Sequence, residues 1–429
     1  MNIIDILNIT KGTLINKINL NLNINKFKIN SKDIKQNDCF IVINNSYKYI
    51  KEAIKNGASL IITNRKSSYN IPTILVQDTI KTLAALASSI RQIYNPKVIA
   101  ITGSVGKTTT RKLIYTILKN KYKCLQNEKN YNNHIGVPLT IFNLKKDDKI
   151  AIIEMGMNHF NEIKYLSNMT KPDIAIITNI GTSHIGNLGS KENILKAKLE
   201  IKEGLNGPLF VNGDDELLKN QNAYKSGFNE NNDLIAYGLK SSLTASSFNI
   251  NLNNKTYKIE VNLPSHLLNN VLLAIHIGLY LDVKIEDIIL SLKQYKSTDM
   301  RMNILNDKNG NTIINDCYNS SLESLNGVLN IIKNEKQNKL LILGDINELG
   351  KYSNEIHQKI PLFLNEIDNK EVILVGKEMA KIIYKDSLHF KDYKEVINYL
   401  KTIQIKNTLI LIKASRSLKL ENITNYLLN

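Results

Sequence analysis

The chain has 429 residues, which is too long for one ordinary hydrophobic core, so we expect two or three domains. Hydrophobic residues make up 43% of it, which excludes a disordered chain, and no apolar stretch approaches the roughly 18–20 residues that span a bilayer. The formal net charge of +17 comes from lysines scattered along the chain, with neither a basic terminal arm nor a cluster of basic and aromatic residues. We therefore expect these charges to lie mostly on a solvated surface that favours anionic substrates, and we do not expect nucleic-acid binding.

The N-terminal residues and the cysteines indicate a soluble cytoplasmic protein. Asp5 lies within the first apolar stretch and no basic leader precedes it, so we expect no secretory signal. Cys39, Cys124 and Cys317 are far apart and odd in number, and they lack the spacing of metal ligands. This usage is typical of reduced thiols in a cytoplasm.

The first segment of the chain is predicted to form a small α/β unit. Short apolar runs at residues 40–43, 60–63 and 73–76 are typical of strands, and helical patterns separate them. An apolar-rich helix over residues 79–94 closes the unit. Asn95 and Pro96 mark a boundary, because the residue before a proline is pushed out of helical geometry.

A glycine-containing loop between a strand and a helix is typical of nucleotide phosphate binding. Residues 98–101 predict a buried strand, and the apolar spacing over residues 113–118 predicts a helix. Such a junction directs backbone N–H groups and the positive end of a helix dipole at one point. Lys107 would reach the outer phosphates and the Thr108 hydroxyl would ligate Mg²⁺, although Ile101 stands where the common pattern has its first glycine. The alternative interpretation of this loop, Thr102-Gly103-Ser104-Val105-Gly106-Lys107-Thr108-Thr109, is a tight strand-to-helix turn.

Polar residues follow the next two predicted strands, residues 150–153 and 174–177. Both runs are nearly all apolar, as in parallel strands covered on both faces, and ligands gather beyond the carboxyl ends of such strands. Glu154 could ligate the Mg²⁺ that Thr108 holds, because Mg²⁺ takes oxygen ligands. A solvated carboxylate is the alternative. His184 lies in the loop after the second strand, where a lone histidine is ordinarily only a surface residue.

The predicted helix over residues 191–205 carries a lysine on its apolar face. Ile194, Ala197 and Ile201 form the apolar stripe, and Lys198 falls on it. An inward lysine must snorkel, pair with a charge or be modified. An unmodified ammonium would repel a bound metal, whereas carbamylation by CO₂ would create an anion that attracts cations.

The run of residues 130–138 is predicted as a polar loop before a strand. Asn132 and Asn133 suit either a turn, which is the default, or recognition of a polar ligand.

The third segment begins near Arg301 and again alternates strands with helices. Strands are predicted at residues 312–314, 340–343, 372–375 and 409–412, with the clearest helix over 322–332. Lys413 and Arg416 could grip a carboxylate or a phosphate, and each could equally be a surface charge. The polar residues that follow the strands are Asp316, Tyr318, Asn319, Lys413, Ser415 and Arg416.

These motifs, in this order, resemble those of the Mur ligases, the ATP-dependent amide ligases of peptidoglycan precursor synthesis. The similarity runs through essentially the whole chain and is strongest over residues 98–205. Within the family, the runs 343–350 and 413–417 are similar to those of members that add D-alanyl-D-alanine, rather than to sibling ligases or folylpolyglutamate synthases. The matching runs are Thr-Gly-Ser-Val-Gly-Lys-Thr-Thr, Asn-Tyr-Asn-Asn-His, Glu-Met-Gly-Met-Asn-His, Lys-Ala-Lys-Leu-Glu-Ile, Asp-Cys-Tyr-Asn, Leu-Gly-Asp-Ile-Asn-Glu-Leu-Gly and Lys-Ala-Ser-Arg-Ser.

The resemblance implies an α/β protein of three domains. Residues 1–94 would form a small α/β domain that binds the UDP end of the substrate. Residues 95–300 would form a central ATP-binding domain with a P-loop NTPase-like, mostly parallel sheet. Residues 301–429 would form a Rossmann-like domain that receives the incoming dipeptide. It also implies a cytoplasmic monomer that joins D-alanyl-D-alanine to UDP-N-acetylmuramoyl-tripeptide through an acyl phosphate, with no nucleic-acid partner and no membrane insertion.

The resemblance also implies roles for single residues. ATP would be bound by Gly103, Ser104, Val105, Gly106, Lys107, Thr108 and Thr109, by Asn270 near the adenine, and by Arg301 and Asp316 from the third domain. Mg²⁺ would be surrounded by Thr108, Glu154 and His184, and catalysis would rest on Lys107, a carbamylated Lys198 and His184. The other substrates would contact Asn132, Asn133, Tyr318, Asn319, Lys413, Ser415 and Arg416.

The chain departs from the family pattern in several places. The usual His-Asn pair is His266-Leu267, the usual Asp-Asp is Asn315-Asp316, and Ala414 replaces a glycine. The first-domain loop, usually rich in Gly and Asp, is shortened to residues 44–49. The alternatives are a sibling amino-acid ligase, a basic P-loop NTPase acting on nucleic acid, and a non-catalytic binding protein.

Overall fold

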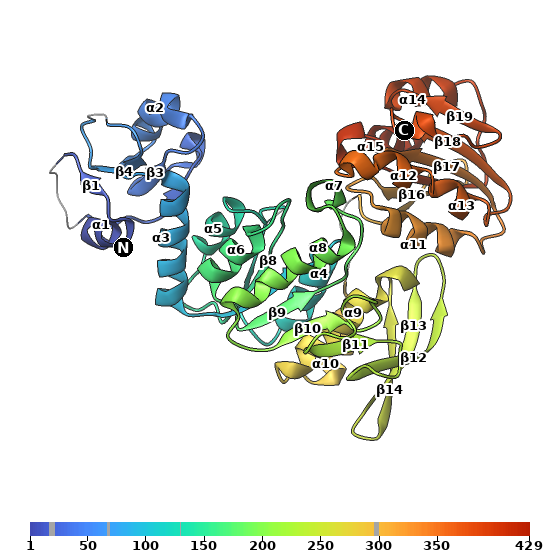
Figure 1. The fold of residues 1–429 in the computed structure, drawn as a ribbon, viewed down its shortest axis with the longest axis horizontal. Helices are drawn as coiled ribbons and strands as arrows, with labels where there is room; N and C mark the ends of the chain where they lie inside the picture. The colour runs from blue at the N-terminus through green and yellow to red at the C-terminus, as the bar shows by residue number, and fades with distance from the viewer. Residues whose placement is uncertain (17–21, 67–68, 129, 296–299) are drawn as a thin grey trace. The chain divides into compact units, whose positions relative to one another are not determined.

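The structure, a computed structural model, describes residues 1–16, 22–66, 69–128, 130–295 and 300–429 (Figure 1). These residues form three mixed, mostly parallel sheets with helices, so the α/β class is confirmed. Packing divides the chain into two compact units. One comprises residues 1–102, 118–175 and 199–209, and the other comprises residues 103–117, 176–198 and 210–429.

The first sheet has five strands in the order β1-β5-β4-β3-β2. Only the β1–β5 pair is antiparallel among them. Helix α3 covers the predicted range because Asp78 caps its first N–H groups and Asn95 ends it in the left-handed region. The elements are α1 (Ile3–Thr10), β1 (Thr13–Leu14), β2 (Phe27–Lys28), β3 (Asp38–Ile41), α2 (Ile50–Lys55), β4 (Ala58–Thr63), β5 (Thr73–Leu75) and α3 (Thr79–Tyr94).

The second sheet has nine strands in the order β14-β13-β12-β11-β10-β9-β6-β8-β7. Its β6, β8 and β9 strands are the three predicted from apolar runs, and their residues are buried apart from Lys97 at the start of β6. The strands are β6 (Lys97–Thr102), β7 (Cys124–Gln126), β8 (Ile150–Glu154), β9 (Ile174–Ile177), β10 (Leu209–Asn212), β11 (Tyr224–Gly227), β12 (Leu234–Ser241), β13 (Ser246–Leu252) and β14 (Lys255–Val261). The helices are α4 (Lys107–Leu118), α5 (Gly136–Ile141), α6 (Glu162–Thr170), α7 (Ile185–Leu188), α8 (Lys191–Leu199), α9 (Leu268–Tyr280) and α10 (Ile285–Lys293).

The polar loop at residues 130–138 leads into helix α5, so the predicted strand is wrong. The side-chain oxygen of Asn133 accepts hydrogen bonds from the N–H groups of Ile135 and Gly136 at 3.1 and 2.8 Å. These bonds satisfy donors that a helix start leaves unpaired. Pro138 falls in the first turn, where its missing N–H costs no helical bond.

The predicted helix over residues 191–205 is shorter than expected. Helix α8 ends at Leu199, and a 3₁₀ turn, Glu200–Gly204, continues it. The hydroxyl of Ser167 donates to the Ile201 carbonyl at 2.6 Å and accepts from the Gly204 N–H at 3.0 Å. This buried serine supplies partners that a longer α-helix would otherwise provide.

The third sheet has six strands in the order β15-β16-β20-β17-β18-β19, and all neighbours are parallel except β15 and β16. Its core is aliphatic, with Ile342, Ile373 and Ile410 fully or almost fully buried. The strands are β15 (Asn303–Asn306), β16 (Thr312–Asp316), β17 (Asn338–Gly344), β18 (Lys370–Val375), β19 (Ser387–Phe390) and β20 (Thr408–Lys413). The helices are α11 (Leu322–Ile332), α12 (Ser353–His357), α13 (Ile360–Leu364), α14 (Tyr393–Leu400) and α15 (Glu421–Leu428).

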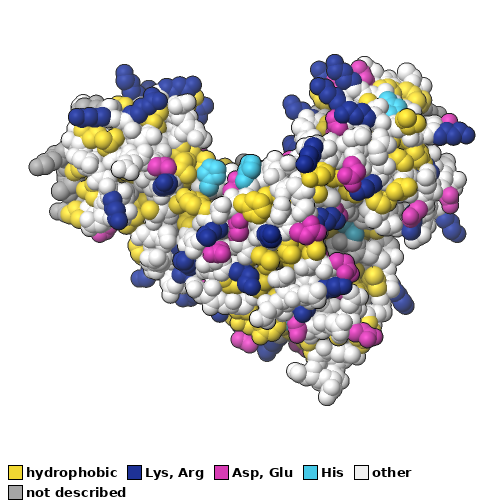
Figure 2. All heavy atoms as spheres, in the orientation of Figure 1, with side chains coloured by type: hydrophobic (Ala, Val, Ile, Leu, Met, Phe, Trp, Pro, Cys, Tyr) yellow, Lys and Arg dark blue, Asp and Glu magenta, His cyan; other side chains and the backbone are white. Residues whose placement is uncertain are grey.

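Figure 2 shows Lys and Arg side chains spread over the visible face and interleaved with Asp and Glu, rather than gathered in one stripe. Among the described residues, no helix is both long and apolar enough to cross a bilayer.

Candidate functional site

The loop between β6 and α4 has the predicted strand–glycine–helix geometry. Gly103 and Gly106 adopt φ angles of +150° and +86°, which side-chain-bearing residues rarely reach. A Cβ atom on Gly103 would lie 1.9 Å from the hydroxyl oxygen of Thr178, and one on Gly106 would lie 2.4 Å from Oδ1 of Asn270. Both glycines are therefore required by conformation and by space, and α4 begins directly after them at Lys107.

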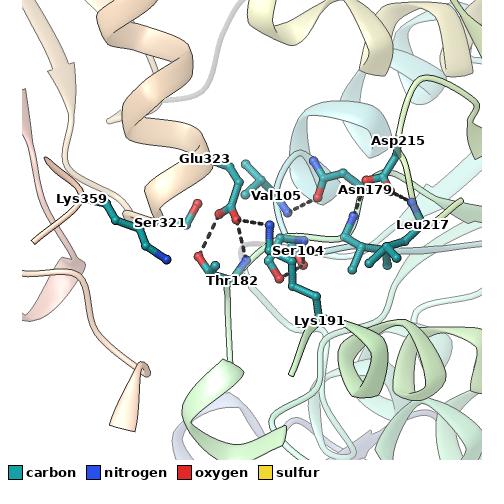
Figure 3. A network of polar contacts seen from close by, with 12 residues as sticks. Ser104, Val105, Asn179, Thr182, Lys191, Asp215, Leu217, Ser321, Glu323 and Lys359 are labelled. Atoms are coloured by element: carbon teal, nitrogen blue, oxygen red, sulfur yellow. Dashed lines mark hydrogen bonds and ion pairs between the residues drawn. The ribbon is translucent and has the colours of Figure 1, made fainter. Parts of the chain in front are cut away.

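The residues that follow β9 form hydrogen bonds with the predicted phosphate-binding loop, residues 103–109 (the phosphate loop). The N–H of Ser104 donates to the Asn179 carbonyl at 3.0 Å, and the N–H of Val105 donates to Oδ1 of Asn179 at 2.9 Å (Figure 3). Thr178 donates its hydroxyl to the Val105 carbonyl at 2.5 Å, and the Gly181 N–H donates to the Ser104 hydroxyl at 2.9 Å. Thr178 and Asn179 directly follow the strand predicted over residues 174–177, and the sequence prediction assigned neither residue a role.

Two predicted nucleotide ligands contact the loop itself. Nζ of Lys107 donates to the Gly103 carbonyl at 2.7 Å. Asn270, only 7% exposed, accepts from the Thr110 hydroxyl at 3.2 Å and lies against Gly106. Asn270 therefore packs on the loop and on the first turn of α4, and its contact with an adenine stays a prediction.

Lys198 lies on the buried face of α8, as predicted. It is 1% exposed and shares that face with Ile194 and Ala197. Burial, and then the nearby charge of Lys107, lower the pKa of Lys198 well below its ordinary value. Both effects favour the neutral amine, because burial removes the water that would stabilise the ammonium and Lys107 repels a second positive charge.

Glu154 ends β8 as a buried carboxylate held by two asparagines. It is 3% exposed, and it pairs in register with Ile101, two residues before Gly103 in the chain. Nδ2 of Asn132 donates to Oε1 of Glu154 at 2.8 Å, and Oδ1 of Asn127 accepts its backbone N–H at 2.6 Å. Asn132 is thus brought to a predicted metal ligand. A carboxylate fixed in this way suits Mg²⁺, which binds oxygen ligands.

His184 lies beside a glutamate that the sequence prediction did not include among the site residues. Its Nδ1 is 2.8 Å from Oε2 of Glu348. The interaction with His184, together with the weaker influence of Lys107, lowers the pKa of Glu348. Glu348 belongs to the run 343–350 that carried the family resemblance, and that was the signal that could have identified it. Among the described residues, no three His, Cys, Asp or Glu side chains form a metal-binding group.

Asp215 is a second residue without a role in the sequence prediction. Its carboxylate accepts the N–H of Ile180 at 2.7 Å and that of Leu217 at 3.0 Å (Figure 3). Burial raises the pKa of Asp215, although these donors oppose that shift. Asp215 therefore fixes the turn that supports the phosphate loop, and no local pattern distinguished it from a surface acid.

In the third segment, Asp316 and Lys413 form a buried ion pair. They are register partners on the parallel strands β16 and β20, and Nζ of Lys413 lies 2.5 Å from Oδ2 of Asp316. The side chain of Lys413 is 1% exposed, and its Nζ also approaches the carbonyl of Asn319 at 3.4 Å. The charges of this pair also act on His266, whose pKa is lowered to about 4. The main cause is the burial of the imidazole; Asp316 opposes the shift and Lys413 adds to it.

The remaining candidates of this segment form separate contacts. The guanidinium of Arg301 lies 4.1 Å from the ring centre of Tyr318, within the range of a cation–π interaction. Ser415 is buried and its hydroxyl accepts the Asn347 N–H at 2.9 Å, whereas Arg416 is exposed and pairs with Glu421 at 2.8 Å. Asn319 is exposed, and its side-chain oxygen accepts the Ser320 N–H at 2.9 Å.

Comparisons with known proteins cover nearly the whole chain. Residues 101–278 match the Mur ligase middle domain, and residues 300–416 match the Mur ligase glutamate ligase domain. The chain is 34% identical over 448 residues to the UDP-N-acetylmuramoyl-tripeptide--D-alanyl-D-alanine ligase of Bacillus subtilis strain 168, covering 99% of this chain and 97% of that protein.

Solved structures give the same result for the fold. Crystal structure I of MurF from Acinetobacter baumannii has a TM-score of 0.91 at 25% identity and covers 100% of this chain and 98% of that chain. The structure of MurF ligase from Thermotoga maritima in complex with ADP has a TM-score of 0.85 at 26% identity and covers 94% of this chain and 96% of that chain. The similarity therefore includes the segments that carry the phosphate loop, Lys198 and the Asp316–Lys413 pair.

Proposed function

This chain belongs to the Mur ligase family, as an ATP-dependent ligase of the type that adds D-alanyl-D-alanine in peptidoglycan precursor synthesis, and we propose that it joins this dipeptide to UDP-N-acetylmuramoyl-tripeptide. The observation that carries the proposal is the 34% identity to the Bacillus subtilis ligase over 99% of this chain. The glycine-built phosphate loop and the buried Lys198 supply the chemistry that such a reaction needs.

The chain is proposed to divide its substrates among three domains. The first, residues 1–94, takes the UDP end, the second, 95–300, takes ATP, and the third, 301–429, takes the dipeptide. Each of the three sheets falls inside one of these ranges, which supports the division. We place the reaction in the cytoplasm, where ATP is supplied, and propose a monomer that takes neither nucleic acid nor membrane as a partner.

The phosphate loop, Gly103–Thr109, is proposed to bind ATP through its N–H groups and Lys107, with Asn270, Arg301 and Asp316 completing the nucleotide site. Thr108, Glu154 and His184 would hold Mg²⁺, whose charge offsets that of the phosphates. The hydroxyl and the buried carboxylate suit this cation better than the imidazole does, because Mg²⁺ prefers oxygen ligands.

The reaction is proposed to have two steps. A carboxylate oxygen of the tripeptide attacks the γ-phosphorus of ATP, and the bond to the β-phosphate oxygen breaks to leave ADP and an acyl phosphate. The dipeptide amine then attacks the acyl carbon, loses a proton and expels inorganic phosphate. Lys107 offsets negative charge that develops during the first step.

Lys198 is proposed to react with CO₂ to form a carbamate. The amine nitrogen bonds to the carbon of CO₂ and releases one proton, so that a buried amine becomes an anion. The lowered pKa supports this step, because only the neutral amine carries the required lone pair. The anion would remove the repulsion between Lys107 and Lys198 and would attract Mg²⁺.

The other substrate contacts are proposed as follows. Asn132 and Asn133 would face the UDP-tripeptide, and Tyr318, Asn319 and Arg416 would contact the dipeptide. Lys413 and Ser415 are buried, so their contribution to that surface would be made through Asp316 and Asn347 respectively.

A matrix of UDP-peptides against amine acceptors, with phosphate release as the measurement, tests the function. Release should require both UDP-N-acetylmuramoyl-tripeptide and D-alanyl-D-alanine. Equal stimulation by glutamate, or by folate with glutamate, would assign the chain to a sibling activity. ATP hydrolysis stimulated by DNA or RNA without an amide product would support the nucleic-acid alternative.

A further inference from the structure

Glu323, in the first turn of α11, makes a two-oxygen contact with the loop that follows β9. Its Oε1 accepts the backbone N–H of Thr182 at 2.8 Å, and its Oε2 accepts the hydroxyl of Thr182 at 2.9 Å (Figure 3). Nζ of Lys191 lies 3.4 Å from the same Oε1. The contact joins residues 141 positions apart in the sequence.

The residues that Glu323 contacts support the nucleotide site. Thr182 directly follows Gly181, whose N–H donates to the Ser104 hydroxyl of the phosphate loop. A Cβ atom on Gly181 would lie 2.9 Å from the carboxyl carbon of Glu323, so a larger residue here would force the carboxylate to shift from its present position. Lys191 begins α8, the helix that carries Lys198. The Glu323 carboxylate thus contacts the loop that holds the phosphate loop, through Thr182, and the first residue of the helix that carries Lys198, through Lys191.

The helix itself does not require this arrangement. The start of α11 is already capped, because the Ser321 and Ser324 side chains each accept the other residue's backbone N–H. An acidic residue in the first turn favours the helix dipole wherever its side chain points. Neither effect accounts for two carboxylate oxygens bound to a single residue of another segment.

We propose that Glu323 is a positioning residue for phosphate transfer. Through Thr182 and Gly181 it fixes the phosphate loop relative to the segment that carries Arg301 and Asp316, so that both parts of the nucleotide site keep one arrangement. The inference rests on the proposed ligase function for its kinetic test. Because the loop's own N–H groups and Lys107 are untouched, removal of the carboxylate should impair alignment more than ATP binding.

The kinetic test compares Glu323→Ala, Glu323→Gln and Thr182→Val with a matched control, Glu366→Gln. The control removes the 3.4 Å pair between Lys333, at the other end of α11, and Glu366. Glu323→Ala should lower kcat about tenfold with the KM for ATP changed less than about twofold, a size typical of coupling between sites. Glu323→Gln, which keeps one acceptor, should lie between wild type and alanine, and the control should match wild type.

Two outcomes would overturn the proposal from kinetics. One is a kcat for Glu323→Ala equal to that of the control. The other is a Glu323→Ala/Thr182→Val double variant whose fold-decrease in kcat equals the product of the two single fold-decreases. Two residues that act through one shared contact should give a smaller combined decrease than that product. A wild-type chain that fails to ligate the two proposed substrates would count against the function instead.

Amide hydrogen exchange tests the same inference without any substrate. The Thr182 N–H donates to Glu323, and the Gly181 N–H depends on the same loop, so both should exchange faster in Glu323→Ala and not in Glu366→Gln. Unchanged exchange over residues 179–184 would refute the positioning role whatever reaction the protein catalyses. Equal thermal unfolding temperatures of the two variants would show that the change is local.

Discussion

Two lysines of this chain are equally buried, and their surroundings give them opposite chemistry. Burial, and then the nearby positive charge of Lys107, lower the pKa of Lys198 in α8. Lys413 in β20 reaches the carboxylate of Asp316 and forms an ion pair. Burial alone therefore does not determine what a lysine does, because one buried lysine has a positive charge nearby and the other has a carboxylate within ion-pair distance. The first arrangement suits a modifiable amine, and the second suits a fixed cation.

The largest effect should come from removing the charge that distinguishes the two sites. Lys107→Ala should lower ATP-dependent ligation by about 1,000-fold or more, because a preorganised charge on the transferred phosphoryl group is lost. Phosphate release with both substrates measures this. Lys119→Ala, just after α4 and exposed, is the matched control and should retain activity. Retained turnover in Lys107→Ala would remove the phosphate-loop assignment.

Lys198→Ala sharpens the comparison through chemical rescue. Ligation should fall by roughly 100-fold and recover in part when formate or acetate is added, because a small carboxylate can replace a carbamate. Lys413→Ala should show no such recovery, since its site needs a cation. The idea of a carbamate fails if short carboxylic acids restore both variants equally, or if a high-resolution electron-density map of active wild-type protein shows an unmodified Lys198.

Lys413→Met should act on stability. It leaves the carboxylate of Asp316 largely buried without its cation, which costs about 3 kcal/mol of unfolding free energy. Urea unfolding measures the loss. The double variant Lys413→Met/Asp316→Leu should recover much of it, because no buried charge remains. A double variant less stable than the single one would contradict this account of the pair.

The smallest expected effect is a pH dependence of stability at Lys198. Its pKa is lower in the folded chain than in the unfolded chain, so the unfolded chain binds more protons and stability falls as pH decreases below the ordinary lysine pKa of 10.5. In buffer freed of CO₂, Lys198→Met should therefore raise the unfolding temperature by a few degrees at neutral pH. The gain should shrink as pH rises towards 10.5, and a gain that is constant with pH would contradict it.

Local patterns predicted the elements well where periodicity and flanking residues agree. Helices α3 and α11 and strand β9 have the predicted bounds, and Lys198 is buried because it lies on an apolar stripe. The strand predicted after residue 138 is wrong, since the Asn133 side chain starts a helix that apolar spacing does not distinguish from a short strand. The antiparallel strands β12 to β14 were also not predicted.

Contacts between residues that are far apart in the chain could not be predicted from the sequence, and the reason is physical. Asp316 contacts Lys413 only because β16 and β20 pair in one register. In the sequence alone, Glu323 is an acidic residue in the first turn of a helix, and this position is favourable without any distant partner. The sequence by itself determined the glycine loop, the strand ends and the inward lysine, since each follows from the conformation of a few consecutive residues. Only the tertiary structure decided which charge each buried lysine meets, and that Glu323 supports the phosphate loop, because electrostatic partners are set by proximity in space.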